Sequence, residues 1–206
     1  MSTQSVAHEH AGPPPGEGSI GHIDRVMVGL FTFLASEVML FGAFFTAFFY
    51  VRYTGTDVFP PEPYDIPVKS TGINTAILIS SSFTMHWALV SVKRDNRRGL
   101  ILGLLFTLIL GLTFLGVQVN EYRTLGWTPE TGAFSTVFYC LTGLHGSHVF
   151  IGATLLAIAL MRSLRGHYSK QSHTGLELTG VYWHFVDVVW VALYATVYLL
   201  ADGVRI

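Results

Sequence analysis

The sequence has few charged residues and a single cysteine. Asp, Glu, Lys and Arg make up 12% of the 206 residues, whereas soluble domains carry about 25%. Cys140 alone excludes an intrachain disulfide and any cysteine-based zinc site or iron–sulfur cluster held by this chain by itself. A net charge of −1 offers no basic surface for nucleic acid. These absences favour an integral membrane protein with no nucleic-acid partner.

Long apolar runs define the predicted fold. Each run reaches the ~20 residues that a helix needs to cross a bilayer, and none alternates as the strands of a membrane barrel do. We therefore predict an all-α integral membrane bundle of five transmembrane helices over residues 25–206, after a polar, disordered, cytoplasmic tail at residues 1–24. The predicted helices cover residues 26–50, 71–92, 99–119, 134–161 and 178–200.

The connections between these runs predict the orientation. Prolines 60, 61, 63 and 67 exclude helix from the first connection and favour an extended cover over one membrane face. The basic connection at residues 93–98 is short enough to make helices 2 and 3 an antiparallel hairpin. Eight Lys and Arg residues flank the N-terminal side and four flank the other side. By the positive-inside rule, the N-terminus is inside and the C-terminus outside.

An acid stands in the middle of the last apolar run. Asp187 lies within the stretch Tyr182–Trp190, where a charge at a helix centre costs about 2.5–3.5 kcal/mol. We expect Asp187 to be protonated, partnered inside the protein, or both. His184, three residues earlier, shares its helical face. Two interpretations stay open, a hydrogen bond that locks this helix to its neighbours or a proton or ligand site, and we favour the first.

A second intramembrane acid, Glu37, has almost only apolar neighbours, which favour its neutral form. A rise of 1.5 Å per residue places Glu37 about 18 Å and Asp187 about 15 Å from the inner ends of their helices. Glu37 is interpreted either as bonded to a neighbouring helix or as serving proton movement or lipid contact. Glu121 is expected to end the third helix at the outer surface. Glu177 is likewise expected at a helix end. The buried polar groups are expected to form one cluster in the inner half.

Two histidines, His145 and His148, lie on one face of the fourth helix. With His184 or His86 they are candidate haem or copper ligands. However, no glutamate has a histidine three residues on, the spacing that carboxylate di-metal bundles use. Glycines 143 and 146 are expected to let another helix approach closely, so we favour a structural histidine pair.

Small and hydroxylated residues mark further helix contacts. On the third helix they recur every four residues and predict a packing seam, made of Gly99, Gly103, Thr107 and Gly111. The run Ser80–Ser82 and Thr84 can bond to carbonyl groups of its own helix. The sequence carries no nucleophile triad, phosphate-binding glycine loop or zinc-protease motif, so nothing in it supports catalysis by this chain alone.

Five segments, in order, resemble subunit III of haem–copper cytochrome c oxidases. The resemblance runs through residues 25–202, and the chain lacks the first two of the seven helices of the long form, as do many bacterial members. In the long form those two helices complete a V-shaped cleft that holds ordered lipids. The matching segments are Ser36–Met39 with Phe41; Asn74, Thr75, Ser81, Ser82 and Thr84; Gln118–Tyr122; Thr142–Val149 with Gly152; and Glu177 with Tyr182–Trp190.

The resemblance implies a subunit without a redox centre. Haems and copper would belong to subunits I and II, and the chain would pack against subunit I, with a small subunit IV as a further partner and cytochrome c reached through the complex. Implied roles are stabilising the complex, holding phospholipids, guiding oxygen and sustaining proton uptake in a bacterial plasma membrane. Glu37 matches the intramembrane carboxyl of the family. The motifs around Glu37 and Glu121 favour the cytochrome c branch over the quinol branch.

Other functions remain as alternatives. The chain could be subunit III of a quinol oxidase, or a haem-binding or metal-binding redox protein that uses the histidines above. A small-solute transporter built around Glu37 and Asp187 would show inverted repeats and broken helices, and the sequence shows neither.

Overall fold

The computed structural model describes residues 25–55 and 66–200 of the chain. Within this part it contains five helices that are long and apolar enough to cross a membrane, which confirms the predicted all-α transmembrane fold. The predicted tail at residues 1–24 and most of the predicted proline-rich cover lie outside the described residues. The helices are α1 (Arg25–Thr54), α2 (Val68–Lys93), α3 (Arg97–Thr124), α4 (Ala133–Leu164) and α5 (Thr174–Leu193).

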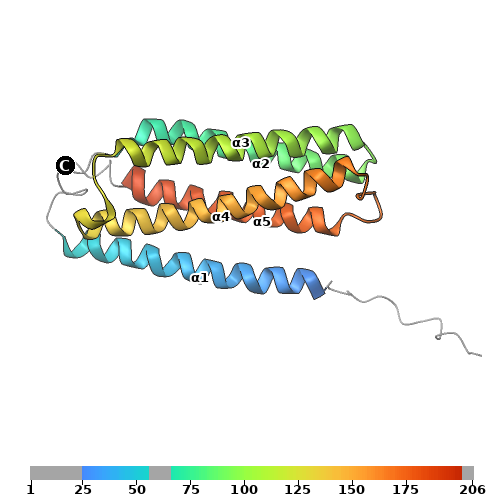
Figure 1. Ribbon diagram of the computed structural model, residues 1–206. Helices are drawn as coiled ribbons and strands as arrows, with labels where there is room; N and C mark the ends of the chain where they lie inside the picture. Colours follow the sequence, from blue (N-terminus) through green and yellow to red (C-terminus); the bar gives the residue numbers. More distant parts are fainter. Residues whose placement is uncertain (1–24, 56–65, 201–206) are drawn as a thin grey trace, which may run out of the picture.

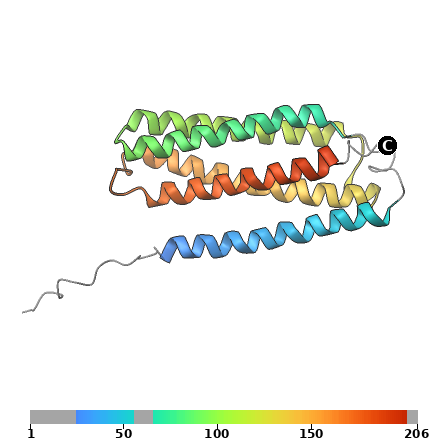
Figure 2. The ribbon, with the colours of Figure 1, turned by 180° about the vertical axis from the view of Figure 1, so that it is seen from behind.

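Helices α2–α5 form a four-helix bundle, and α1 lies outside it. Helices α2, α3, α4 and α5 form a ring in which each packs along two others of the four, and α1 lies along α4 and α5 (Figures 1 and 2). The buried residues of α1 are Leu34, Phe41 and Phe48, spaced seven apart. This spacing puts them in a single stripe, so α1 touches the bundle along one face.

The α2–α3 connection confirms the predicted antiparallel hairpin. Helix α2 ends at Lys93 and α3 begins at Arg97, after a turn in which Asp95 has a φ of 56°. The Asn96 side chain accepts a hydrogen bond from the backbone N–H of Gly99 at 3.1 Å and caps α3. A left-handed residue followed by an N-cap reverses the chain within three residues, and the two helices lie side by side (Figure 2).

The predicted seam on α3 is a close helix contact, as expected. A Cβ atom added at Gly103 would lie 2.8 Å from the Cβ atom of Ala88 on α2. One turn along, the hydroxyl oxygens of Thr107 and Thr84 lie 2.7 Å apart. Small side chains therefore bring α2 and α3 together, and the two hydroxyl groups join them where the backbones are near.

Two tryptophans of α5 fill the centre of the bundle. Trp183 and Trp190 are both fully buried. They lie seven positions apart, on one face of the helix. The indole N–H of Trp183 donates to the Ser81 hydroxyl and that of Trp190 to the Thr75 hydroxyl, each at 2.9 Å. Glycines 111 and 152 make room for the Trp183 ring, because a Cβ atom at either would lie within 3.0 Å of it. Helix α5 is thereby fixed against α2, α3 and α4.

Outside the membrane-spanning helices, the α4–α5 connection packs against the end of α4. The Arg162 guanidinium carbon lies 5.4 Å from the centre of the Tyr168 ring, a cation–π distance. Burial raises the pKa of the Tyr168 hydroxyl above its usual value, and the nearby Arg162 charge opposes that shift. The hydroxyl therefore stays protonated at neutral pH, and the stacked arginine fixes the loop.

Replacing Gly103 with Ala should destabilise the protein. The added methyl group meets Ala88 backbone and Cβ atoms at 2.8–3.0 Å, and overpacking of this kind costs about 1–3 kcal/mol. Gly116→Ala on the same helix is the control, because nothing lies within 4 Å of a Cβ atom there. Thermal unfolding in detergent should show a lower midpoint for Gly103→Ala only; equal midpoints would refute the close contact.

Candidate functional site

Glu37 is paired with His148, so it is not isolated. The carboxylate oxygen Oε2 lies 2.9 Å from Nε2 of the imidazole, and both side chains are largely buried, 14% and 9% exposed. The other ring nitrogen of His148 lies 2.8 Å from the Leu144 carbonyl oxygen. A carbonyl can only accept, so Nδ1 carries a proton, and one further proton lies between Nε2 and Glu37. Whether neutral or an ion pair, the two groups together carry no net charge.

Aromatic rings surround this pair and join three helices. The Phe41 ring lies 5.2 Å from the His148 ring, and the Tyr182 hydroxyl donates to the His148 backbone carbonyl at 3.2 Å. Tyr182 in turn stacks on Phe33, with ring centres 6.5 Å apart. The pair thus ties α1 to α4, and Tyr182 adds α5. The first interpretation of Glu37, a hydrogen bond to a neighbouring helix, is therefore present in the structure.

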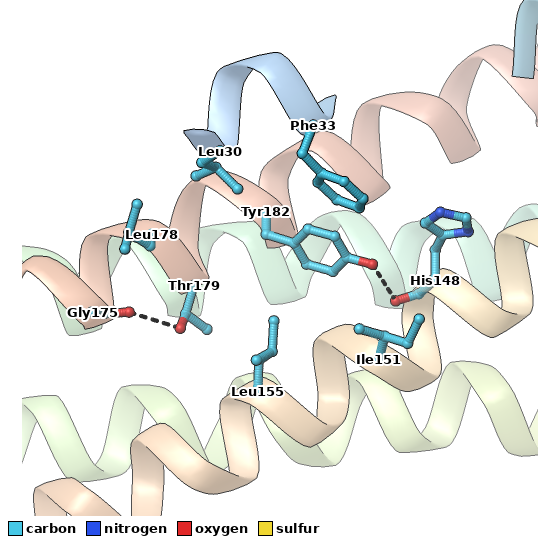
Figure 3. Close-up of a pocket in the computed structure, with 9 residues that line it drawn as sticks. All are labelled: Leu30, Phe33, His148, Ile151, Leu155, Gly175, Leu178, Thr179 and Tyr182. Atoms are coloured by element: carbon cyan, nitrogen blue, oxygen red, sulfur yellow. Dashed lines mark hydrogen bonds between the residues drawn. The ribbon is translucent and has the colours of Figure 1, made fainter. Parts of the chain in front are cut away.

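An apolar groove of about 370 Å³ begins beside His148, the partner of Glu37 (Figure 3). The only hydroxyl groups drawn in its wall are already bonded, because Thr179 donates to the Gly175 carbonyl at 2.9 Å and Tyr182 donates to His148. Such a surface suits an acyl chain better than a polar substrate. The α1–α4–α5 groove is lined by Leu30, Phe33, His148, Ile151, Leu155, Gly175, Leu178, Thr179 and Tyr182.

Asp187 and His184 share a partner on α2. The Ser82 hydroxyl donates to Oδ2 of Asp187 and lies 3.1 Å from Nδ1 of His184. Asp187 is only 5% exposed, and its other oxygen, Oδ1, has no hydrogen-bond partner among the described residues. The common face predicted for His184 and Asp187 is therefore real, and a serine of the neighbouring helix meets both side chains.

Sequence reasoning missed the role of Ser82. Ser80 and Ser81 bond to carbonyl groups of their own helix, as predicted for the whole run. Ser82 lies about 100° further round the helix than Ser81, on a different face. Three consecutive residues of a helix point in different directions. This offset was the signal in the sequence that Ser82 has other neighbours than Ser81.

The remaining histidines do not form a set of metal ligands in the described part of the chain. His145 is fully buried between the rings of Trp190 and Phe114, at 4.7 and 5.8 Å between ring centres. Its two ring nitrogens have no hydrogen-bond partner in the described part of the chain. His86 is exposed on α2. Within residues 25–55 and 66–200, no three His, Cys, Asp or Glu side chains gather as metal ligands would.

Glu121 lies in the last turn of α3, the helix-end position expected from the sequence, but its side chain is buried. It is only 4% exposed and accepts hydrogen bonds from the hydroxyl groups of Thr71 and Tyr198, each at 3.0 Å. Tyr198 belongs to a π-helical turn, η2 (Tyr194–Leu199), which continues α5. Helix α3 ends three residues later, at Thr124, and the carboxylate is covered by α2 and η2. Neither partner could be found by following the periodicity of one helix.

Glu177 links two helices at the opposite end of the molecule. It forms an ion pair of 2.8 Å with Lys93 at the end of α2, and His173 lies 3.4 Å away. Its side chain is 31% exposed, which fits the helix-end position expected from the sequence. The contact ties the start of α5 to the α2–α3 hairpin.

Two further expectations need correction. The polar groups form separate sets between α1 and α4, between α2 and α5, and around Glu121, rather than one inner cluster. No helix of the described chain packs closely on glycines 143 and 146, because among these residues a Cβ atom at Gly146 would meet nothing within 4 Å and one at Gly143 only the Tyr122 hydroxyl at 4.0 Å. Depth alone does not say which helices are neighbours.

Replacing Asp187 with Ala should weaken the protein more than replacing Glu37 with Gln. The alanine removes the buried carboxyl group that the Ser82 hydroxyl bonds to, and loss of a buried hydrogen-bond partner costs about 1–3 kcal/mol. Glutamine keeps a group able to bond to His148, and Asp187→Asn, which keeps an acceptor for Ser82, is the matched control. The midpoint of thermal unfolding should be highest for Glu37→Gln, lower for Asp187→Asn and lowest for Asp187→Ala. Equal midpoints for the first and last variants would contradict this assignment.

Comparison with known proteins identifies the family of this chain. The family profile described as cytochrome c oxidase subunit III matches residues 16–202. The cytochrome c oxidase subunit 3 of Thermostichus vulcanus is 44% identical over 87% of this chain and 89% of that protein. That of Synechocystis is 42% identical over 90% and 81%, and the human protein is 34% identical over 96% and 76%. This chain therefore belongs to the cytochrome c oxidase subunit III family.

Proposed function

We propose that this chain is the subunit III of a proton-pumping terminal oxidase that takes electrons from cytochrome c and reduces oxygen to water. As a member of the family, it is a multi-pass, non-catalytic oxidase subunit without a redox centre of its own. In the proposed complex, subunits I and II carry the haems and copper. The chain stabilises subunit I, holds phospholipid, and supports proton uptake and the access of oxygen.

The observation that carries the finer part of this proposal is the Glu37–His148 pair beside the α1–α4–α5 groove. The pair attaches the outlying helix α1, and α1 supplies Leu30 and Phe33 to one wall of the groove. A bound acyl chain would cover these apolar walls in the assembled complex. Because oxygen dissolves readily in hydrocarbon, a lipid-filled groove also offers it a path. Proton handling by the pair is secondary to this structural role.

The placement of basic residues supports the proposed orientation. The start of α1, the α2–α3 turn and the α4–α5 connection all lie at one end of the molecule (Figure 1). This end holds Arg25, the basic turn at residues 93–98, and Arg162 and Arg165. By the positive-inside rule it faces the cytoplasm, in a bacterial plasma membrane. The Lys93–Glu177 ion pair and Tyr168 then lie at the cytoplasmic surface.

Purification tests this function directly. A tagged chain, extracted in mild detergent, should bring down haem-containing and copper-containing subunits, and the complex should consume oxygen with reduced cytochrome c. The chain separated from its partners should show no haem band and no stoichiometric metal. A stoichiometric haem spectrum in the separated chain would overturn the proposal, and oxygen consumption with quinol only would place the complex in the quinol branch.

Replacing Glu37 with Leu should loosen α1, whereas Glu37→Gln should leave assembly and electron transfer largely intact. Leucine removes the bond to His148, and interhelical side-chain bonds in membranes contribute about 0.6–1.7 kcal/mol. Phospholipid retained per complex should fall in Glu37→Leu while haem content and the rate of haem reduction stay unchanged. Complete loss of oxidase assembly in Glu37→Gln would count against this role.

A further inference from the structure

Three buried polar side chains meet beside one turn of α3, in the C-terminal half of that helix. The Asn74 amide of α2 donates to the Phe114 backbone carbonyl at 3.2 Å. The His145 ring of α4 meets the Phe114 ring edge-on, with 5.8 Å between the ring centres. Gln118 follows Phe114 by one turn and shares its helical face. We call Asn74, Gln118 and His145 the α2–α3–α4 polar cluster.

Five side-chain atoms of this cluster have no hydrogen-bond partner among the described residues. They are Oδ1 of Asn74, both amide atoms of Gln118 and both ring nitrogens of His145. The three residues are 1%, 2% and 0% exposed, so the bundle encloses them. Buried polar atoms without partners destabilise a folded protein, and native structures contain only a few of them. Five in one place therefore point to a polar ligand.

The hydroxyl groups beside Gln118 do not supply the missing donors. Gln118 lies close to the hydroxyl groups of Tyr122 and Tyr198. One of these donates to the Thr142 hydroxyl at 2.8 Å and the other to the Glu121 carboxylate at 3.0 Å. A hydroxyl has one hydrogen, so both can only accept from the amide nitrogen of Gln118. The two amide oxygens of the cluster still need a donor.

The chemistry of the five atoms selects the class of ligand. The amide oxygens accept hydrogen bonds, whereas a neutral imidazole donates through one nitrogen and accepts through the other. A metal cation would suit the oxygens but not the imidazole N–H, and an acyl chain offers neither donor nor acceptor. Water donates two hydrogen bonds and accepts two, and a buried water in a protein makes about three.

The aromatic neighbours of His145 favour such a site. Its ring lies between those of Trp190 and Phe114, at 4.7 and 5.8 Å between ring centres. These rings pack against the imidazole and fix its plane. The two nitrogens lie at the edge of that plane, where a small molecule can reach them without displacing either aromatic ring.

We propose that ordered water binds in the α2–α3–α4 polar cluster and links Asn74, Gln118 and His145 across three helices. The water is a structural part of the bundle, and it accounts for His145 as a water ligand rather than a metal ligand. The inference concerns the interior of this chain, so it does not depend on the electron donor or on the lipid proposed above.

A high-resolution cryo-EM map of the purified complex that contains this chain tests the site directly. We expect a water peak about 2.7–3.2 Å from at least two of the five unpaired atoms. A map that shows ordered water elsewhere in the complex but none in the cluster would overturn the inference. Direct hydrogen bonds among the three side chains in place of the water, or a cation held by the amide oxygens, would overturn it as well.

A matched pair of substitutions at His145 gives a second readout. Glutamine and methionine have similar length and shape, but glutamine alone of the two can both donate to water and accept from it. With water in the cluster, the midpoint of thermal unfolding should be several degrees higher for His145→Gln than for His145→Met. In a dry cluster the buried amide has no partner, so the order reverses. Equal midpoints or the reversed order would contradict the proposal, and the map of the unmodified protein decides if neither variant assembles.

Discussion

Hydrocarbon supplies no hydrogen-bond partners, and this constraint governs how the helices meet. Each polar side chain at depth must find its partner on its own helix, on a neighbouring helix or on another chain. Within this chain, partners lie on the same helix or on a neighbouring helix. Ser80 bonds to its own helix, Trp183 and Trp190 reach hydroxyl groups of α2, and Glu37 reaches His148. A few buried groups, among them Oδ1 of Asp187 and the ring nitrogens of His145, have no hydrogen-bond partner among the described residues.

Helix α5 is the element on which these contacts converge. Its two tryptophans occupy the bundle centre, Tyr182 faces α1 and α4, and Asp187 faces α2. Two grooves lie along it, one beside α1 and one beside α2. A subunit without redox chemistry acts through such surfaces. The dense packing of this helix keeps both surfaces in place.

The sequence predicted the parts of this structure that depend on one helix at a time. Five membrane-spanning helices, the seam at Gly103 and Thr107, and the common face of His184 and Asp187 all follow from length and periodicity. The Glu37–His148 pair joins residues 111 positions apart, and periodicity does not show which helices adjoin. For the same reason one polar cluster was expected where several exist. Glu121 lies near a helix end as expected, but its burial depends on Thr71 and Tyr198 of other elements, which periodicity does not place beside it.

Polar contacts between helices, rather than cofactor ligation, account for the intramembrane acids Glu37 and Asp187 and for His148 and His184 beside them. A double-mutant cycle on Glu37 and His148, with each residue changed to Leu singly and together in the purified complex, tests this most directly. We expect a coupling energy of about 0.6–1.7 kcal/mol between the two side chains. A coupling of zero, with the two single losses of stability simply adding, would contradict the account.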